Sequence, residues 1–160
     1  MAWFISDHHF NHSKVIEYCN RDFNNVEEMN KHMINEWNKV VKEGDTVYHL
    51  GDFIFNPKRE ETFELINLLN RSITLVKGNH DRKTVTWYKS VGIKEVLTGP
   101  VSIDGYILSH APVDVEKIPT GVVNIHGHIH NKLIKEYLTE EYLNVSADVL
   151  NYTSIWIDLK

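Results

Sequence analysis

The chain has 160 residues, of which 42% are hydrophobic and 24% are charged, as expected for one globular domain with a core of its own. Its net charge is −5 with the histidines neutral, which disfavours a general binder of duplex DNA because such a protein needs a basic surface. One cysteine allows no disulfide within the chain and fits a reducing, cytoplasmic setting, and we expect neither a signal peptide nor a membrane span.

The first half of the chain alternates short apolar runs with helical patterns. Residues 2–6 are predicted to form a strand. Apolar side chains at helical spacing from Val26 to Val41 predict a helix, with Asn24 or Asn25 as its cap and Gly44 at its end. The elements expected next are a strand at 46–50, a helix from Asn56-Pro57 to about residue 70, a strand at 73–76 and a short helix at 83–90.

From Lys94 onward the pattern changes to short apolar runs separated by turn signals. Asp104-Gly105 lies between two such runs and is the strongest short signal for a β-hairpin. Further strands are expected at residues 122–125, 134–138, 142–145 and 153–159. A βαβαβα half followed by a mostly β half predicts a single domain over residues 1–160, with a mixed sheet or two facing sheets and helices outside.

Side chains that bind metals follow five of the predicted strands. These segments are Asp7-His8-His9, His49-Leu50-Gly51-Asp52, Gly78-Asn79-His80-Asp81, Ser109-His110 and Gly127-His128-Ile129-His130. In open α/β sheets the functional site lies beyond the carboxyl ends of the strands. Chance is a poor explanation for five strand ends that each carry a metal-type ligand. Glycine precedes the polar residue in three of them, and glycine allows a sharp turn and a close backbone approach to a ligand.

The ligand types indicate divalent metal ions. Two aspartates, one asparagine and four histidines form a mixed oxygen and nitrogen set without the thiolates of a structural zinc site. Such a set suits Mn²⁺, Fe²⁺, Ni²⁺ or Zn²⁺ better than Ca²⁺, and we expect Mn²⁺ first. Seven ligands exceed the needs of one ion and suit two ions that share a carboxylate. Two cations about 3.5–4 Å apart can clamp an in-line displacement at phosphorus.

The histidines of the stretch NIHGHIHN, residues 124–131, alternate along the chain and share one side of an extended backbone. A polar strand face that happens to be rich in histidine is the alternative to a metal site there. His126 lies on the strand itself and is expected to pack or to support a ligand. The same surface, capping or supporting roles are expected of His8, His12, His32 and His49.

The series D-x-H, G-D, G-N-H-D, S-H and G-H-x-H, in this order from Asp7 to His130, resembles the calcineurin-like metallophosphoesterase superfamily. The chain is similar to the small stand-alone phosphoesterases of bacteria and phages within it. The resemblance implies an α/β (α+β) fold, a four-layer αββα sandwich with two mixed β-sheets flanked by helices. It also implies hydrolysis of a phosphoester by a hydroxide held between two metal ions.

The resemblance also implies a role for each motif residue. One ion would be held by Asp7, His9 and His130, the other by Asn79, His110 and His128, with Asp52 bridging both. His80 would stabilise or protonate the leaving-group oxygen, and Asp81 would orient His80 or a ligand.

Arg21 and Arg82 lie outside the implied ligand set and are candidates for binding phosphate oxygens, because a guanidinium group suits them. A solvated or ion-paired arginine is the alternative at both positions.

The segment GDFIFNP places Phe55 and Asn56 where protein Ser/Thr phosphatases of the superfamily carry an Asp-Arg pair. We therefore expect a phosphodiesterase that acts on a small or nucleotide-like ester. The alternatives are a phosphomonoesterase with the same site and a non-catalytic scaffold of the same fold, which the presence of His80 disfavours. The sequence leaves the natural substrate, the native metal and the oligomeric state open.

Overall fold

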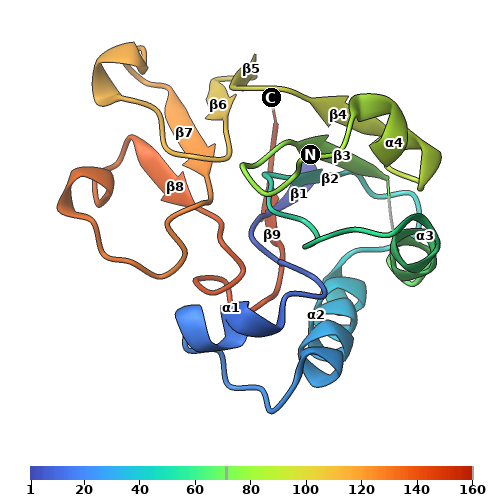
Figure 1. The fold of residues 1–160 in the computed structure, drawn as a ribbon. Coiled ribbons are helices and arrows are strands. Elements are labelled where there is room, and N and C mark those ends of the chain that lie inside the picture. The colour runs from blue at the N-terminus through green and yellow to red at the C-terminus, as the bar shows by residue number, and fades with distance from the viewer. Residues whose placement is uncertain (71, 160) are drawn as a thin grey trace.

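The computed structural model describes residues 1–70 and 72–159, and its first sheet has the strand order β4-β3-β2-β1-β9 (Figure 1). These strands are β1 Ala2–Ile5, β2 Val47–His49, β3 Ile73–Val76, β4 Glu95–Leu97 and β9 Ile155–Ile157. Strands β1 to β4 pair in parallel, whereas β9 runs antiparallel to β1. The sheet is therefore mixed, with the parallel strand β4 at one edge and the antiparallel strand β9 at the other.

The second sheet has the order β5-β6-β7-β8. Its strands are β5 Val101–Ile103, β6 Tyr106–Leu108, β7 Val123–His126 and β8 Tyr142–Asn144. The predicted hairpin joins β5 and β6, and its turn residues Asp104 and Gly105 have φ angles of 46° and 83°. Both positive angles fit the turn that matches the twist of a two-residue hairpin. The remaining pairs are parallel, so this sheet is also mixed.

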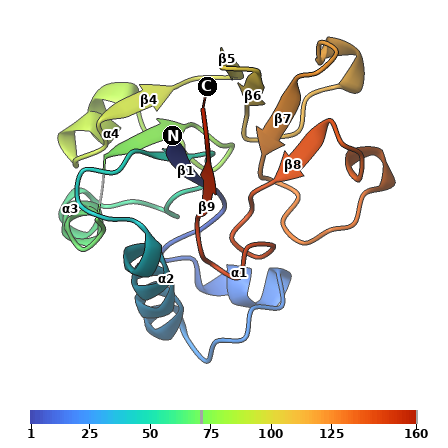
Figure 2. The same ribbon diagram turned by 180° about the vertical axis from the view of Figure 1, so that it is seen from behind.

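Among the described residues of the first 90 there are four α-helices, α1 Ser13–Tyr18, α2 Val26–Val40, α3 Arg59–Asn67 and α4 Val85–Ser90. Asn25 caps α2 by accepting a hydrogen bond from the backbone of Glu28. In the described part of the chain after β4, helical structure consists of the 3₁₀ turns η1 Val115–Lys117 and η2 Lys135–Tyr137. In Figures 1 and 2, α2, α3 and α4 lie on the side of the first sheet, α1 lies below β9 and β8, and the second sheet lies on the other side of the molecule.

Two apolar clusters lie on opposite faces of the first sheet. On β1, Ile5 joins a cluster that includes Met33 and Trp37 of α2, whereas its neighbour Phe4 joins a cluster that includes Ile125 of β7. Successive side chains of a strand point to opposite faces, so one strand serves both the helix-to-sheet core and the sheet-to-sheet core. The expected α/β sandwich of two mixed sheets with helices is confirmed.

Some expected elements differ in the structure. The helix expected from Asn56-Pro57 begins at Arg59, because Asn56 adopts a φ of 44° that belongs to a turn. The strand expected at residues 134–138 is wrong, and η2 occupies its place. Strand β8 pairs in parallel with β7, so the chain between them must cross over and cannot add a hairpin strand. Helix α1 and strand β4 were not expected. Among the described residues, no helix has both the length and the apolar character needed to cross a membrane.

Candidate metal centre

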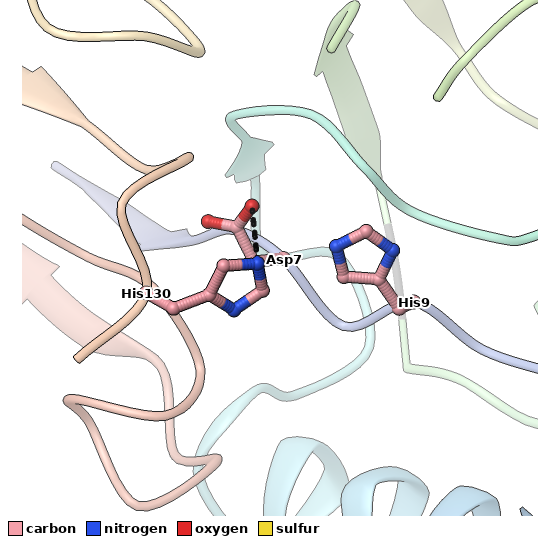
Figure 3. A group of neighbouring side chains, drawn as sticks. All are labelled: Asp7, His9 and His130. Atoms are coloured by element: carbon pink, nitrogen blue, oxygen red, sulfur yellow. Dashed lines mark ion pairs between the residues drawn. The ribbon is translucent and has the colours of Figure 1, made fainter. Parts of the chain in front are cut away.

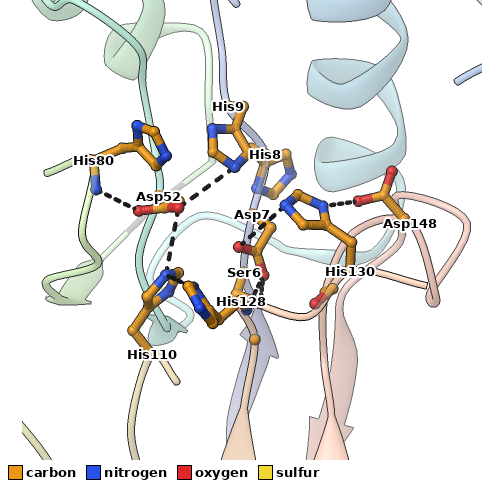
Figure 4. A network of polar contacts seen from close by, with 12 residues as sticks. Ser6, Asp7, His8, His9, Asp52, His80, His110, His128, His130 and Asp148 are labelled. Atoms are coloured by element: carbon orange, nitrogen blue, oxygen red, sulfur yellow. Dashed lines mark hydrogen bonds and ion pairs between the residues drawn. The ribbon is translucent and has the colours of Figure 1, made fainter. Parts of the chain in front are cut away.

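The ends of five strands bring the predicted ligands together in one cluster (Figure 4). Strands β1, β2 and β3 are parallel in the first sheet, as are β6 and β7 in the second, so the segments that follow them converge. The seven predicted ligands all lie on these segments: Asp7 and His9 after β1, Asp52 after β2, Asn79 after β3, His110 after β6, and His128 and His130 after β7.

The carboxylate of Asp52 lies between two other predicted ligands, His9 and His110. Its Oδ2 is 3.5 Å from Nε2 of His9 and 3.3 Å from Nε2 of His110. The same His110 nitrogen is 2.9 Å from Oδ1 of Asn79 and 3.1 Å from Nδ1 of His128. One imidazole proton cannot serve three acceptors well, whereas a cation among these atoms would satisfy all of them.

His110 and Asp52 perturb each other electrostatically. His110 Nδ1 lies 2.9 Å from the carbonyl oxygen of Leu50 and can donate to it, which leaves Nε2 for the cluster. Burial by itself would lower the pKa of His110, but the contact with Asp52 raises this pKa to about 9. Against the effect of burial, the same contact holds the pKa of Asp52 below the ordinary carboxyl range. This buried carboxylate therefore stays charged and available to a cation.

Asp7, His9 and His130 form a second part of the cluster, in which one ligand atom from each lies within 4.8 Å of the others (Figure 3). His130 Nε2 is 4.0 Å from Asp7 Oδ1. Among the described residues, Asp7 Oδ1 and both ring nitrogens of His9 are buried without a hydrogen-bond partner. Buried polar atoms are rarely left unsatisfied, so these atoms fit a bound metal ion.

The backbone is strained at most of the ligand positions. A positive φ is uncommon outside glycine and costs free energy, so such residues cluster at functional sites. Five of the seven predicted ligands adopt it: Asp7 (58°), His9 (51°), Asp52 (53°), His128 (70°) and His130 (51°). The surrounding structure therefore holds the backbone of these residues in an unfavourable conformation, as is common at functional sites.

Two motif glycines allow the ligand loops to approach closely. A Cβ atom on Gly127 would lie 2.1 Å from Ser6 Oγ and 2.3 Å from Asp7 Oδ2. A Cβ atom on Gly78 would lie 2.3 Å from Asp52 Oδ1. Any side chain at either position would displace a predicted ligand.

Asp81 supports the cluster through the backbone. It is buried, and its carboxylate accepts hydrogen bonds from the backbone N–H groups of Asp52 (2.7 Å), Gly78 (2.8 Å) and Phe53 (3.2 Å). Tyr88 Oη donates to it at 3.3 Å. Asp81 was expected to orient either His80 or a metal ligand. These contacts agree with the second role, because they hold the backbone of Asp52, and none of them is made to the ring of His80.

His80 lies beside the cluster. Its backbone N–H donates to Asp52 Oδ1 at 2.9 Å, and its ring makes an edge contact with the ring of His9 at 5.3 Å between centroids. The side chain is partly exposed. This position leaves the ring free to meet a molecule bound over the cluster.

Arg21 does not occupy the position expected of a phosphate-binding residue. Its buried guanidinium donates to both carboxylate oxygens of Asp148 and to the carbonyl oxygens of Asp7 and His8. Its remaining N–H faces sulfur atoms of α2. No donor is left for a phosphate, so the substrate-binding role expected of Arg21 is corrected to a structural one. Arg82 is exposed, and its role stays a prediction.

Asp148 was not among the predicted site residues, yet its Oδ2 is 2.6 Å from Nδ1 of His130. It lies in the turn region after β8 and belongs to none of the motifs, so no local signal singles it out. Ser6 was also missed. Its hydroxyl donates to Asp7 Oδ2 at 2.6 Å, and the backbone N–H of His128 donates to the same oxygen at 2.9 Å. These contacts leave Asp7 Oδ1 as the free oxygen.

Several other histidines pack around the cluster. His8 and His49 are fully buried and meet at 2.9 Å between Nδ1 and Nε2, rather than lying on the surface. His126 is buried against the rings of Tyr137 and Tyr142, in the packing role expected of it.

Comparisons with known proteins agree with this arrangement. The sequence profile described as calcineurin-like phosphoesterase matches residues 2–156. An uncharacterized protein of Methanocaldococcus jannaschii is 40% identical over 98% of this chain and 87% of its own. The Gene 66 protein of Mycobacterium phage D29 is 30% identical over 99% of this chain and 90% of its own.

Solved structures share the fold. A protein of unknown function from Aquifex aeolicus superposes with a TM-score of 0.74 at 27% identity, over 97% of this chain and 94% of that chain. The nuclease MPE of Pseudomonas putida superposes with a TM-score of 0.56 at 19% identity, over 79% of this chain and 60% of that chain. With its motif residues gathered in one cluster and its profile matched over nearly its whole length, the chain belongs to the calcineurin-like phosphoesterase family.

Proposed function

We propose that this protein is a phosphodiesterase that uses two divalent cations, Mn²⁺ first among them, to hydrolyse a small or nucleotide-like phosphodiester. The observation that carries the proposal is the gathering of seven metal-type ligands, in which the carboxylate of Asp52 lies between His9 and His110 and buried atoms of Asp7 and His9 have no hydrogen-bond partner. Family membership supports the coarser statement that the protein is a metal-dependent phosphoester hydrolase.

The ligands divide into two sets that share Asp52. Asp7, His9 and His130 would hold one cation, and Asn79, His110 and His128 would hold the other. Bound there, two cations would offset the charge of the phosphoryl oxygens and make a water molecule nucleophilic at neutral pH. The chain itself brings the ligands together at the strand ends, with Asp7, His9, Asp52 and His110 buried and Asn79 and His128 exposed, so little reorganisation is needed when the substrate binds.

His80 is the proposed proton donor to the leaving group. Its backbone is fixed by the hydrogen bond to Asp52, while its ring is partly exposed beside His9. A ring in this place can reach an ester oxygen on the open side of the cluster. General acid help of this kind typically accelerates a reaction by about 10²–10⁴-fold.

An aromatic surface next to His80 supports an ester with an aryl or nucleobase group. The ring of Phe55 stacks on that of His12 with centroids 3.9 Å apart and planes 8° apart. Both rings lie 6.3 Å from the ring of His80, and Phe55 is 37% exposed. Aromatic side chains offer a stacking surface to bases without regard to sequence. The likeness in fold to a nuclease agrees with an ester of this class.

The protein is proposed to act in the cytoplasm, where its one cysteine, Cys19, would stay reduced. A small phosphoester is its proposed partner, and the net charge of −5 argues against duplex nucleic acid.

The proposal is tested by stripping the protein of metal and reloading separate samples with Mn²⁺, Ni²⁺, Zn²⁺ or Mg²⁺. Each sample is assayed with bis(p-nitrophenyl) phosphate, p-nitrophenyl phosphate and a phosphoserine peptide, and its metal content is measured. We expect about two ions per chain with Mn²⁺, and faster hydrolysis of the diester than of the peptide. Faster hydrolysis of the monoester would favour a phosphomonoesterase. Full occupancy without turnover of any ester would favour a scaffold.

A further inference from the structure

We propose that Asp148 and Arg21 form a positioning pair that holds His130 in the orientation and tautomer needed to bind a cation together with Asp7 and His9. This inference rests on the metal site of the proposed function and adds to it two residues outside the motifs.

The contact between Asp148 and His130 fixes which ring nitrogen faces the cluster. His130 Nδ1 lies 2.6 Å from Asp148 Oδ2, and Nε2 on the opposite side of the ring lies 4.0 Å from Asp7 Oδ1 (Figure 4). A neutral imidazole has one N–H donor and one lone pair. When Nδ1–H donates to the carboxylate, the lone pair is on Nε2 and points toward Asp7. Carboxylates behind a metal-binding histidine act in this way.

Arg21 fixes the carboxylate in turn. Its Nε donates to Asp148 Oδ1 at 2.8 Å and one terminal nitrogen donates to Oδ2 at 3.0 Å, so the pair is bidentate. The side chains of Arg21 and Asp148 are 0% and 4% exposed. Planar guanidinium geometry makes such a fork rigid.

The guanidinium of Arg21 also binds the backbone of the segment that carries Asp7 and His9. Its two terminal nitrogens donate to the carbonyl oxygens of His8 and Asp7, each at 2.7 Å. Asp7 and His9 adopt a positive φ, so this loop needs external support. Arg21 therefore joins the segment that carries Asp7 and His9 to the segment that orients His130.

Asp148 is better placed to position His130 than to bind a cation itself. A geometric cluster of Cys19, His130 and Asp148 exists, with ligand atoms within 4.8 Å of one another. However, both carboxylate oxygens of Asp148 already accept hydrogen bonds, Oδ1 from Arg21 and Oδ2 from Arg21 and His130. A cation at Cys19 would have to displace these contacts.

The test compares Asp148→Asn and Arg21→Lys with the wild type. An asparagine must place its NH₂ group toward Arg21 or toward His130, so it either breaks the fork or favours the wrong tautomer. A lysine keeps the charge of Arg21 but cannot reach all four acceptors. Asp114→Asn is the matched control, because Asp114 is exposed and pairs with Lys117 on the surface.

Mn²⁺ alone is the probe, added to metal-free protein and followed by electron paramagnetic resonance and calorimetry. The wild type and Asp114→Asn should bind two ions and give the spectrum of a coupled pair. In Asp148→Asn and Arg21→Lys one ion should bind about 10–100-fold more weakly, so that a single-ion spectrum appears first, while the other affinity is kept. Nitrogen shifts of the His130 ring in protein loaded with diamagnetic Zn²⁺ should show Nδ1–H in the wild type and its loss in Asp148→Asn.

The outcomes separate the two proposals. Two ions in the wild type with unchanged affinities and ring shifts in both variants would overturn the positioning role. Equal loss of both ions together with a large fall in melting temperature would also overturn it, because the pair would then act on the whole fold. A wild type that binds no Mn²⁺ would overturn the metal site of the proposed function, and the positioning role with it.

Discussion

The carboxylate of Asp81 accepts a hydrogen bond from the backbone N–H of Asp52 at 2.7 Å, although 29 positions separate the two residues in the sequence. It also accepts from the backbone of Gly78 at 2.8 Å. One buried side chain thus ties the loop after β2 to the loop after β3. The position of the proposed bridging ligand therefore depends on a residue that does not itself face the cluster.

Asp81→Asn is expected to destabilise the fold. An amide offers one acceptor oxygen where the carboxylate serves three backbone N–H groups, and its NH₂ would face other donors. Hydrogen bonds to charged groups contribute roughly 1.5–3 kcal/mol each, so the free energy of unfolding should fall by at least about 2 kcal/mol. Urea titration of metal-free protein measures it, with the exposed Asp158→Asn as control. Unchanged stability with slower turnover of poor leaving groups alone would instead show that Asp81 acts through His80.

Asp52→Asn is expected to weaken both cations and to abolish turnover. Its Oδ2 lies between His9 and His110, which belong to different predicted sites. Asn79→Ala is the matched comparison, because Asn79 hydrogen-bonds to His110 of one predicted site and its loss should affect mainly one ion. Metal content after dialysis measures both. Full occupancy and activity in Asp52→Asn would show that the bridging role is wrong.

The sequence carries most of the information on the cluster because the ligands sit at strand ends. Glycine before Asp52, before Asn79 and before His128 is a local signal for a sharp turn, and parallel strands then bring the turns together. Asp148 has no such signal, since its contact with His130 exists only in the tertiary structure. The local sequence around Arg21 does not distinguish a solvated arginine from a buried one, so its hydrogen-bond partners could not be predicted.

The same limit applies to the elements. Apolar residues around Ile134 match a strand pattern, but the parallel pairing of β7 with β8 decides that this segment crosses over instead. The hairpin at Asp104-Gly105 was predictable because its turn chemistry is local.

Gly127→Ala is expected to damage the site beside Asp7. The added Cβ would lie 2.1 Å from Ser6 Oγ and 2.3 Å from Asp7 Oδ2, so one segment must move. Overpacking of this kind typically costs about 1–3 kcal/mol, and the moved carboxylate should bind Mn²⁺ more weakly. Gly121→Asn is the control, because among the described residues beyond its two chain neighbours no atom lies within 4 Å of its Cβ position, and asparagine tolerates its φ of 80°. A Gly127→Ala protein with wild-type melting temperature and Mn²⁺ affinity would contradict the close approach.

Metal-free protein is expected to lose stability as the pH falls below about 6.5, the ordinary pKa of histidine. Burial lowers the pKa of His8 to about 3, and burial also lowers the pKa of its partner His49 far below the ordinary value. The unfolded chain therefore binds more protons than the folded chain between about pH 6.5 and 3. Each such histidine should reduce the free energy of unfolding by about 1.4 kcal/mol per pH unit in this range.

The slope with pH, measured by urea titration in the presence of a chelator, isolates this effect. His8→Phe keeps a ring to stack on Phe10 but removes one buried proton site, so the slope should fall by about 1.4 kcal/mol per pH unit. His32→Gln on α2 is the control, because His32 is partly exposed. An unchanged slope in His8→Phe would mean that His8 is not held neutral in the fold.

His80→Ala is expected to slow catalysis while leaving the metal site in place. The His80 ring contacts the edge of the His9 ring, and only its backbone N–H reaches Asp52, so its removal takes away no predicted ligand. Loss of a general acid should lower turnover by about 10²–10⁴-fold for esters with poor leaving groups, and by less for nitrophenyl esters that need little protonation. A series of aryl diesters with graded leaving groups, run on wild type and variant with metal content measured on the same samples, gives the dependence. Arg82→Ala serves as a comparison, because Arg82 is exposed and lies two positions after His80. Loss of a phosphate contact there should lower the turnover of all esters by the same factor. A steeper dependence in His80→Ala with both ions present identifies His80 as the proton donor, whereas loss of an ion would make it a ligand and require a new division of roles.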